Sequence, residues 1–221
     1  MTTKKQSLLQ QNCLGVVLTG GLSSRMGEDK ALLSRDDHKN KTNNVTNSKN
    51  NMLSFSTEQL TKAGVDSVVI SGKQHGIADK FENLGPMGGI YTIIKKYQPK
   101  SLLILPVDLP LIDYQSLQQL KLIGELSQQA CFYHDNFLPL YLPTTAFVEQ
   151  FFDQAFLPFK RENTIQAKSG VKKGPSIKAM LKQVPHKILY PTNSHSLFNA
   201  NTPEQWQQAK QQFQKNRKVH V

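Results

Sequence analysis

Short apolar runs alternate with helical patterns along the first half of this chain. Strands are expected where apolar residues follow one another over a short stretch, at residues 14–18, 65–70 and 102–105. Residues 57–63 are expected to form part of a helix. A second helix is expected over residues 85–97, with Pro86 at a favoured first helical position. Strands that alternate with helices predict a mostly parallel sheet with helices on both faces.

The alternation fails in the second half of the chain. Asp113 is expected to cap a helix that continues through Ile123. Two apolar segments follow, residues 130–133 and 138–142, and the polar residues 134–136 between them predict a hairpin. We therefore expect an α/β protein: one Rossmann-like, three-layer domain with a mostly parallel but mixed central sheet.

A chain of 221 residues is long enough for a sizeable core, and we assign residues 1–221 to a single domain. Residues 39–51 differ in kind, because six of the thirteen are Asn and three are Lys. A segment of this composition cannot bury a core and is expected to form a mobile surface loop. It is either a neutral insertion or, given its closeness in sequence to Lys30, a lid.

Composition narrows the classes of partner. The formal net charge of +11 suits nucleic acid, an anionic membrane surface or acidic small molecules. The charge is spread along the chain, aromatic residues make up only 8%, and no stretch approaches the ~20 apolar residues of a membrane span. These features disfavour nucleic acid and membranes and favour a polyphosphate substrate. Cys13 and Cys131 give neither a disulfide framework nor metal-ligand spacing, and together with a polar N-terminus they predict a cytoplasmic protein.

The segment from Leu18 to Lys30 carries the first chemical motif, Leu-Thr-Gly-Gly-Leu-Ser-Ser-Arg-Met-Gly-Glu-Asp-Lys. It follows the first expected strand, and its paired glycines let backbone N–H groups approach phosphate oxygens. Arg25 and Lys30 supply the positive charge that a triphosphate needs. The spacing fits neither a P-loop nor a dinucleotide-binding fingerprint. The alternative is a glycine-rich turn with both cations in solvent.

Asp108 stands just beyond the expected buried strand at residues 102–105. Ligands of open α/β sheets bind outside the carboxyl ends of strands, so Asp108 is expected at the same edge as the glycine loop. A carboxylate beside a triphosphate favours Mg²⁺, which takes one or two carboxylates plus substrate phosphates, and Mn²⁺ is also compatible. In the alternative interpretation, Asp108 only forms the turn before Pro110. The histidines are scattered and form no hydrolytic arrangement.

The string at residues 18–30 resembles the signature L-x-G-G-x-S-x-R-M-G-x-x-K of a nucleotidyltransferase family that includes the molybdenum cofactor guanylyltransferases. Residues 85–89, Gly-Pro-Met-Gly-Gly, are similar to the family's G-P-L-A-G segment. Residues 199–203, Asn-Ala-Asn-Thr-Pro, are similar to its N-x-N-T-P close. The resemblance spans residues 14–206 apart from the insertion, and the chain departs from it at Val107, where the family has cysteine.

The resemblance implies the roles of individual residues. Arg25, Lys30 and Asp108 would be catalytic, and Asp108 and Asn201 would bind the metal. The residues that would bind the nucleotide are Leu18, Thr19, Gly20, Gly21, Lys30, Ser71, Asp79, Gly85 and Asp108. Asp79 would contact the base or ribose, since a carboxylate can accept the N1–H and amino protons of guanine. The alternative is that Asp79 is an ordinary surface residue.

The roles of Asn201, Ser71 and residues 168–174 are less directly implied. Thr202 and Gln205 are explained by a helix capping box, which leaves Asn201 for the metal or the phosphates. Ser71 stands where relatives have asparagine, although a hydroxyl can still bond a ligand. The basic stretch at residues 168–174 forms either an anion site for a pterin phosphate or a solvated loop.

The reaction implied by the resemblance is the Mg²⁺-dependent transfer of GMP from GTP to the molybdopterin form of the molybdenum cofactor, with release of pyrophosphate. GTP and the pterin are the implied substrates, and molybdoenzymes or other cofactor-biosynthesis proteins are the implied partners. Three alternatives stay open: a cytidylyl- or sugar-phosphate nucleotidyltransferase, a non-catalytic nucleotide-binding protein that delivers cofactor, and a basic nucleic-acid-binding protein. The motifs hold phosphates rather than bases and leave the choice of base open.

Overall fold

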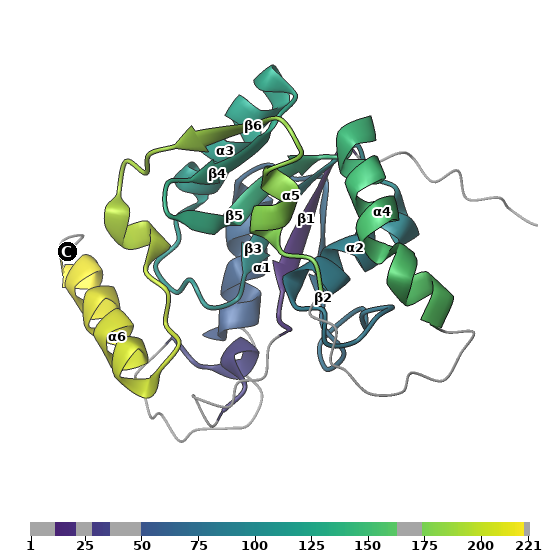
Figure 1. The fold of residues 1–221 in the computed structure, drawn as a ribbon. Coiled ribbons are helices and arrows are strands. Elements are labelled where there is room, and N and C mark those ends of the chain that lie inside the picture. The colour runs from purple at the N-terminus through teal and green to yellow at the C-terminus, as the bar shows by residue number, and fades with distance from the viewer. Residues whose placement is uncertain (1–11, 21–27, 36–49, 163–173, 219–221) are drawn as a thin grey trace, which may run out of the picture.

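The computed structural model describes residues 12–20, 28–35, 50–162 and 174–218, which form three layers around a six-stranded sheet (Figure 1). The strands are β1 (Cys13–Leu18), β2 (Ser67–Ser71), β3 (Ser101–Pro106), β4 (Ala130–Tyr133), β5 (Asn136–Pro143) and β6 (His186–Leu189). Their order is β2-β1-β3-β5-β4-β6. β1 pairs in parallel with β2 and β3, and β4 with β6, whereas β5 is antiparallel to both neighbours. The predicted mixed sheet is therefore confirmed.

Helices cover both faces of the sheet. One face carries α2 (Pro86–Tyr97), α4 (Ala146–Glu162) and α5 (Ile177–Leu181), and the other carries α1 (Met52–Lys62), α3 (Tyr114–Ser127) and α6 (Pro203–Lys218). The short 3-10 helices are η1 (Lys30–Leu32) and η3 (Ser194–Leu197). Within the described segments, no helix combines the length and the apolar character that crossing a membrane requires.

Side-chain alternation along the interior strands β1 and β3 divides the core. Leu102 and Ile104 of β3 point into the layer of α2, α4 and α5, whereas Leu103 and Leu105 point into the layer of α1, α3 and α6. All four are fully buried, because a central strand with helices on both faces has no solvent side. This two-sided burial explains why β1 and β3 appear in the sequence as continuous apolar runs.

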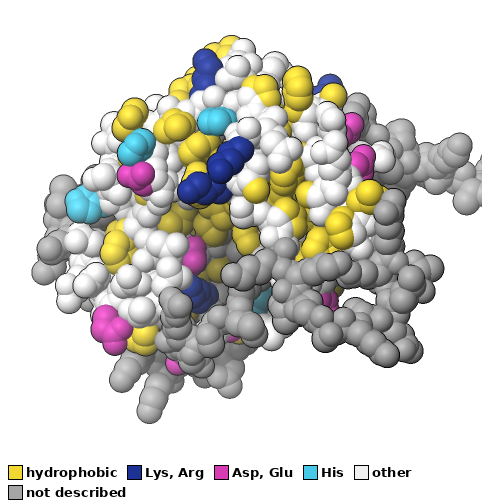
Figure 2. Space-filling model, in the orientation of Figure 1, with side chains coloured by type: hydrophobic (Ala, Val, Ile, Leu, Met, Phe, Trp, Pro, Cys, Tyr) yellow, Lys and Arg dark blue, Asp and Glu magenta, His cyan; other side chains and the backbone are white. Residues whose placement is uncertain are grey.

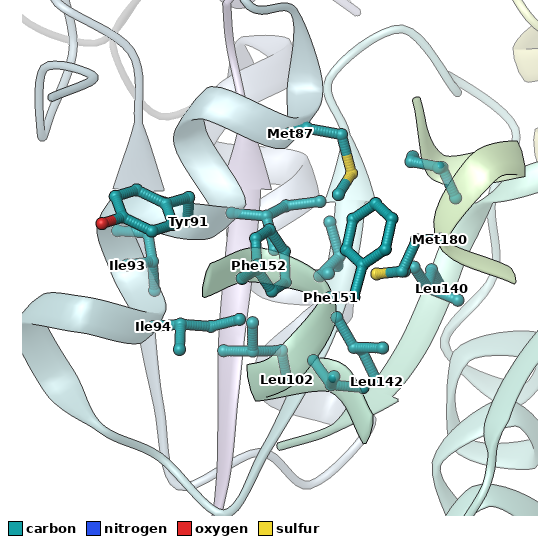
Figure 3. Close-up of a cluster of buried hydrophobic side chains, with 14 of the residues drawn as sticks. Met87, Tyr91, Ile93, Ile94, Leu102, Leu140, Leu142, Phe151, Phe152 and Met180 are labelled. Carbon is teal, nitrogen blue, oxygen red and sulfur yellow. The ribbon is translucent and has the colours of Figure 1, made fainter. Parts of the chain in front are cut away.

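The first of the two core layers is rich in aromatic rings. Tyr91 of α2 stacks on Phe156 of α4, with ring centroids 4.2 Å apart and planes 6° apart. Figure 3 shows Tyr91, Phe152 and Phe151 lying above Leu102 and Leu142 of the sheet, with Met87 and Met180 beside them. This packing fixes α2, and therefore the position of the N-terminus of α2, relative to β1 and β3.

The three parallel strands end in register. Leu18 is paired with Ser71 of β2 on one side and with Pro106 of β3 on the other. Beyond the strands, the backbone N–H of Thr19 donates to the Ser71 carbonyl at 2.9 Å, and that of Val107 donates to the Leu18 carbonyl at 3.1 Å. The segments that follow β1, β2 and β3 therefore leave one edge of the sheet side by side.

The structure extends one predicted helix, shifts one predicted strand and contains elements that were not predicted. The predicted helical residues 57–63 belong to the end of α1, which begins at Met52 because the Asn51 side chain accepts the Ser54 N–H at 2.9 Å and caps the helix. The end of the Asn-rich segment thus belongs to the folded protein, and residues 36–49 lie outside the described residues. β2 occupies Ser67–Ser71 rather than residues 65–70. The elements α4 and β6 were not predicted.

Charged side chains are interspersed on the face drawn in Figure 2. Lys and Arg, acidic and His side chains alternate with apolar and neutral ones there, and no broad basic patch covers the described part of this face.

Truncation of the central aromatic ring tests the packing of α4 on α2. Phe156→Ala removes a side chain that is 0% exposed and is expected to lower the free energy of unfolding by about 3–5 kcal/mol. Urea denaturation followed by the fluorescence of Trp206, the single tryptophan, measures the change. Phe147→Ala, on the same helix but 57% exposed, is the matched control and should change stability by less than about 0.5 kcal/mol. Equal losses in the two variants would contradict this description of the core.

Candidate active site

A pocket of about 300 Å³ opens at the carboxyl ends of β1 and β3. Its lining residues come from six separate parts of the chain: Leu18, Thr19, Gly20, Lys30, Pro86, Pro106, Val107, Asp108, Leu138 and Asn201. This is the edge at which the ends of three parallel strands meet, and open α/β sheets bind ligands there. The pocket is thus a product of the sheet topology.

Three polar side chains meet in this pocket. The Lys30 ammonium lies 3.5 Å from Asp108 Oδ2 and donates to Asn201 Oδ1 at 2.5 Å. The Lys30 and Asp108 side chains are only 17% and 21% exposed, so their attraction is less screened than that of a surface pair. The expectation that Lys30 and Asp108 lie at the same edge of the sheet is confirmed, and Asn201 joins them.

Local hydrogen bonds fix the backbone of Asp108 and Asn201, the two residues whose oxygens contact Lys30. The Asp108 carbonyl accepts the Ala200 N–H at 2.9 Å, which ties the loop after β3 to the segment that carries Asn201. Gln205 Oε1 accepts the N–H groups of Asn201 and Thr202, at 2.7 and 3.1 Å, and the Gln205 N–H donates to the Thr202 hydroxyl at 3.3 Å. The predicted capping box is confirmed, and it also orients the backbone of Asn201.

The second carboxylate oxygen of Asp108 is suited to a cation. Oδ1 is buried and has no hydrogen-bond partner among the described residues, although a buried carboxylate oxygen normally has one. Asp108 and Asn201 offer oxygen donors only, which is the chemistry that Mg²⁺ and Mn²⁺ prefer. No group of three or more His, Cys, Asp or Glu side chains in the described segments is placed to hold a metal ion. A cation here would therefore depend on ligands from substrate phosphates, as Mg²⁺ often does.

Asp29 and His75, whose contact was not predicted from the sequence, position the segment that carries Lys30. Asp29 caps η1 by accepting the Ala31 N–H at 2.9 Å, and its other oxygen lies 2.5 Å from His75 Nε2. Lys30 is the first residue of η1, so the cap determines where its side chain leaves the backbone. His75 lies in the loop after β2, and its contact links that loop to the lysine segment.

Arg35 anchors the other end of the lysine segment. Its guanidinium lies 3.4 Å from the ring centroid of Phe55 in α1 and 4.4 Å from that of Phe213 in α6, and it donates to the Pro110 carbonyl at 3.1 Å. Cation–π contacts on two rings hold a guanidinium firmly. The short segment that bears Lys30 is thus fixed at both ends, by His75 before it and by Arg35 after it.

Ser71 and Asp79 lie next to the pocket rather than in its lining. The Ser71 carbonyl accepts both the backbone N–H and the hydroxyl of Thr19, each at 2.9 Å, and the Ser71 hydroxyl donates to Asp79 Oδ1 at 3.5 Å. Burial raises the pKa of Asp79, and the Ser71 hydrogen bond opposes this shift. The two predicted nucleotide-binding residues are therefore paired with each other and joined to the pocket through Thr19.

The first turn of α2 packs closely against Ser71 and Asp79 because Gly89 has no side chain. A Cβ on Gly89 would lie 2.2 Å from the Ser71 hydroxyl and 3.3 Å from Asp79 Oδ1, so only glycine allows this approach. Gly85 caps the helix with φ of 62°, a conformation that favours glycine, and Pro86 takes the first helical position as predicted. Gly89, which the sequence analysis did not assign to the site, is needed for its geometry.

The remaining predicted site residues have different outcomes. Gly20 and Leu18 line the pocket, and Gly85 adjoins it through Pro86. Gly21 and Arg25 lie outside the described residues, as does most of the basic stretch at residues 168–174.

Comparison with known proteins identifies the family. Residues 15–154 match the model of the MobA-like NTP transferase domain. The molybdenum cofactor guanylyltransferase of Xanthomonas euvesicatoria is 32% identical over 204 residues, which cover 90% of this chain and 94% of that protein. The enzyme of the same name from Campylobacter jejuni is 31% identical over 134 residues, 55% of this chain and 59% of that protein.

Solved structures share the fold at low identity. The molybdopterin-guanine dinucleotide biosynthesis protein A of Archaeoglobus fulgidus superposes with a TM-score of 0.66 at 17% identity, covering 91% of this chain and 99% of that one. The 2-C-methyl-D-erythritol 4-phosphate cytidylyltransferase of Thermus thermophilus gives 0.55 at 10% identity, covering 90% and 98%. The expected α/β fold class is confirmed, and the sequence matches show that the chain belongs to the MobA-like NTP transferase family.

Proposed function

We propose that this protein, a nucleotidyltransferase by family, transfers GMP from GTP to the molybdopterin form of the molybdenum cofactor and releases pyrophosphate. One observation carries the proposal: the Lys30 ammonium, the Asp108 carboxylate and the Asn201 amide meet in a pocket at the carboxyl ends of β1 and β3. A relative that shares 32% identity over 90% of the chain bears the guanylyltransferase name, which supports the choice of substrates.

The chemistry is an in-line displacement at the α-phosphorus of GTP. An oxygen of the terminal phosphate of the pterin forms the new P–O bond while the bond to pyrophosphate breaks. Lys30 offsets the negative charge that builds up on the phosphoryl oxygens and the leaving group, and the Gly20 backbone approaches the phosphates closely. Arg25 is proposed to share the neutralisation of charge, on the strength of its place in the family signature. Catalysis then consists of positioning and charge stabilisation, without a covalent intermediate.

Asp108 and Asn201 are the residues that would hold Mg²⁺, or Mn²⁺ in its place. The buried Asp108 Oδ1, which lacks a hydrogen-bond partner in the described part of the chain, supports this role. When bound, the ion supplies Lewis acidity and a template for the phosphates. The Lys30 ammonium contacts the other Asp108 oxygen and the Asn201 oxygen, so it has to release at least one of them for the phosphates.

Base selection is assigned to Asp79 with the help of Ser71. An ionised carboxylate can accept both the N1–H and the amino protons of guanine, a pair of donors that cytosine lacks. Because burial raises the pKa of Asp79, its ionised form is lost at a higher pH on acidification than that of an exposed aspartate. The hydroxyl of Ser71 favours the ionised form. The alternative of a cytidylyl- or sugar-phosphate transferase has the same fold and differs in these contacts.

A cytoplasmic location and handover of the product to molybdoenzymes or other cofactor-biosynthesis proteins complete the proposal. Cys13 and Cys131 are both free and buried, which suits a reducing compartment. Burial raises the pKa of the Cys13 thiol to about 11, so this thiol is unreactive at neutral pH.

Removal of either charged group should disable turnover. Lys30→Ala and Asp108→Ala are each expected to lower the rate at saturating GTP and Mg²⁺ by at least ~10²-fold, the cost of losing one preorganised electrostatic contact. Pyrophosphate release with the pterin acceptor measures this rate. Lys62→Ala, which breaks one surface ion pair, and Asp153→Ala, which breaks two, are the matched controls and should keep wild-type rates. Near wild-type rates in both pocket variants would contradict the assigned roles.

His75 should act through the position of Lys30. His75→Ala removes the contact to Asp29 and is expected to lower turnover by about 10-fold to 100-fold, within the ~10² that a small misplacement of a catalytic group can cost. KM for GTP should change less than turnover. His75→Gln, whose amide can still donate to Asp29, should restore much of the rate. Equal losses of turnover in His75→Gln and His75→Ala, or a loss as large in the surface variant His186→Ala, would contradict a positioning role for His75.

Protection against heat separates the nucleotide alternatives. GTP with Mg²⁺ at 100 times its Kd should stabilise the protein by about 2.7 kcal/mol, and CTP and ATP at the same concentration should do so far less. Greater protection by CTP would favour a cytidylyltransferase. Protection by GTP without pterin-dependent release of pyrophosphate would favour a non-catalytic nucleotide-binding protein.

A further inference from the structure

A second pocket, of about 350 Å³, lies where β4 and β6 end. Its walls come from the turn between β4 and β5, from the segment after β6, and from η3 with the residues that follow it. The side chains that matter here are His134, Asp135, Asn136, Tyr190 and His195. None of them takes part in the chemistry assigned to the first pocket.

The second pocket lies at the same edge of the sheet as the first. Because β5 is antiparallel to both β3 and β4, β3 and β4 run in the same direction, and β6 runs parallel to β4. The carboxyl ends of β4 and β6 therefore point the same way as those of β1 and β3. The two pockets are thus arranged along one rim of the molecule.

Two stretches of chain connect the pockets directly. Asn136 lines the second pocket and Leu138 lines the first, and the two residues are separated along β5 by about 7 Å. Phe198 lines the second pocket, and Asn201 of the first lies three positions further on. A molecule with a ring system at one end and a phosphate at the other could therefore occupy both.

An aromatic pair forms the side of the second pocket. The His134 imidazole stacks on the Tyr190 ring, with centroids 5.2 Å apart and planes 19° apart. Tyr190 is nevertheless 73% exposed, so its ring is largely open to solvent. Hydrogen bonds hold the pair in place: His134 Nδ1 contacts Asp135 Oδ2 at 2.9 Å, and the His134 N–H donates to the Leu189 carbonyl at 2.8 Å. A rigid, exposed aromatic surface next to a reaction site is suited to stack on a flat heterocycle.

We propose that this second pocket binds the fused pterin ring of the acceptor, with Tyr190 and His134 as the stacking surface and Asp135 as acceptor for the ring's amide and amino protons. The inference rests on the proposed function, because that function supplies an acceptor with a ring and a phosphate. Guanine has the same donor edge as a pterin, so the geometry of the reaction decides between them. Asp79 and Ser71 lie beside the end of β2, on the other side of the first pocket.

The geometry of in-line displacement favours placing the nucleoside and the pterin on opposite sides of the first pocket. The attacking phosphate must reach the α-phosphorus from the side opposite the departing pyrophosphate, so the acceptor cannot share space with the nucleoside or the triphosphate. In the order of the sheet, β2 lies at one edge and β4 and β6 at the other, with β1 and β3 between them. The nucleoside belongs on the β2 side and the pterin on the side of β4 and β6.

Three variants of the full-length protein test the assignment. Tyr190→Ala removes the exposed ring, Tyr190→Phe keeps the stacking surface, and Asp135→Asn removes the carboxylate at a φ of 61° that asparagine also tolerates. Phe147→Ala, which removes an exposed aromatic ring from α4, is the matched control. Binding is measured by fluorescence titration with neopterin monophosphate, a pterin with a phosphorylated side chain. KM for the molybdopterin acceptor and heat protection by GTP with Mg²⁺ are measured in parallel.

Tyr190→Ala and Asp135→Asn are expected to weaken binding of the pterin probe at least ~10-fold and to raise KM for the acceptor similarly, since each removes a principal contact of the ring. Tyr190→Phe and Phe147→Ala should bind the probe as the wild type does. All variants should keep wild-type protection by GTP.

The outcomes separate the two proposals. The inference is overturned if the wild type does not bind the probe, if Tyr190→Ala binds it unchanged, or if Tyr190→Ala loses protection by GTP instead, which would place guanine in this pocket. Probe binding that is lost in Tyr190→Ala, in a wild type without pterin-dependent pyrophosphate release, would support the pocket and overturn the proposed transferase activity.

Discussion

The ammonium group of Lys30 holds the candidate site together. It bridges the carboxylate of Asp108 and the amide of Asn201, and Asn201 is 171 positions away in the sequence. The contact exists because β1 and β3 end in register and because the Asp108 carbonyl is bonded to Ala200. A cation held between two oxygens in a partly buried pocket keeps the site close to neutral before any substrate binds. In the proposed reaction, the first binding step is therefore an exchange of partners, in which phosphates and a metal ion compete for groups that are already in position.

That exchange requires the lysine to be held by its backbone as well as by its charged end. The cap from Asp29, the contact of Asp29 with His75 and the Arg35 clamp between two aromatic rings hold the backbone at both ends of the segment. The ammonium can then leave Asp108 or Asn201 without the segment moving. A group whose backbone is fixed needs little reorganisation during reaction, which is the condition under which electrostatic stabilisation is most effective.

The sequence predicted what depends on continuous patterns and missed what depends on contacts between distant residues. β1 and β3 were predicted because strands buried on both faces are apolar throughout. β6 was missed because it is short and mostly exposed, and α4 because Pro158 interrupts its pattern. The start of α1 was hidden because the capping Asn51 ends an Asn-rich run. The Asp29–His75 contact joins residues 46 positions apart, and its only signal in the sequence is a capping residue before Lys30.

The same sheet edge explains why one fold can serve different bases and acceptors. In the proposed reaction, the interior strands β1 and β3 carry the phosphate chemistry, and their ends are fixed by register and by a core buried on both faces. The flanking strands end in loops whose side chains are exposed or only partly buried, such as the turn at His134 and the segment at Tyr190. Changes there cost little packing energy, because they do not disturb the core. In the proposed arrangement, specificity for the base on the β2 side and for the acceptor on the side of β4 and β6 can therefore change independently, provided that Lys30 and Asp108 stay where β1 and β3 put them.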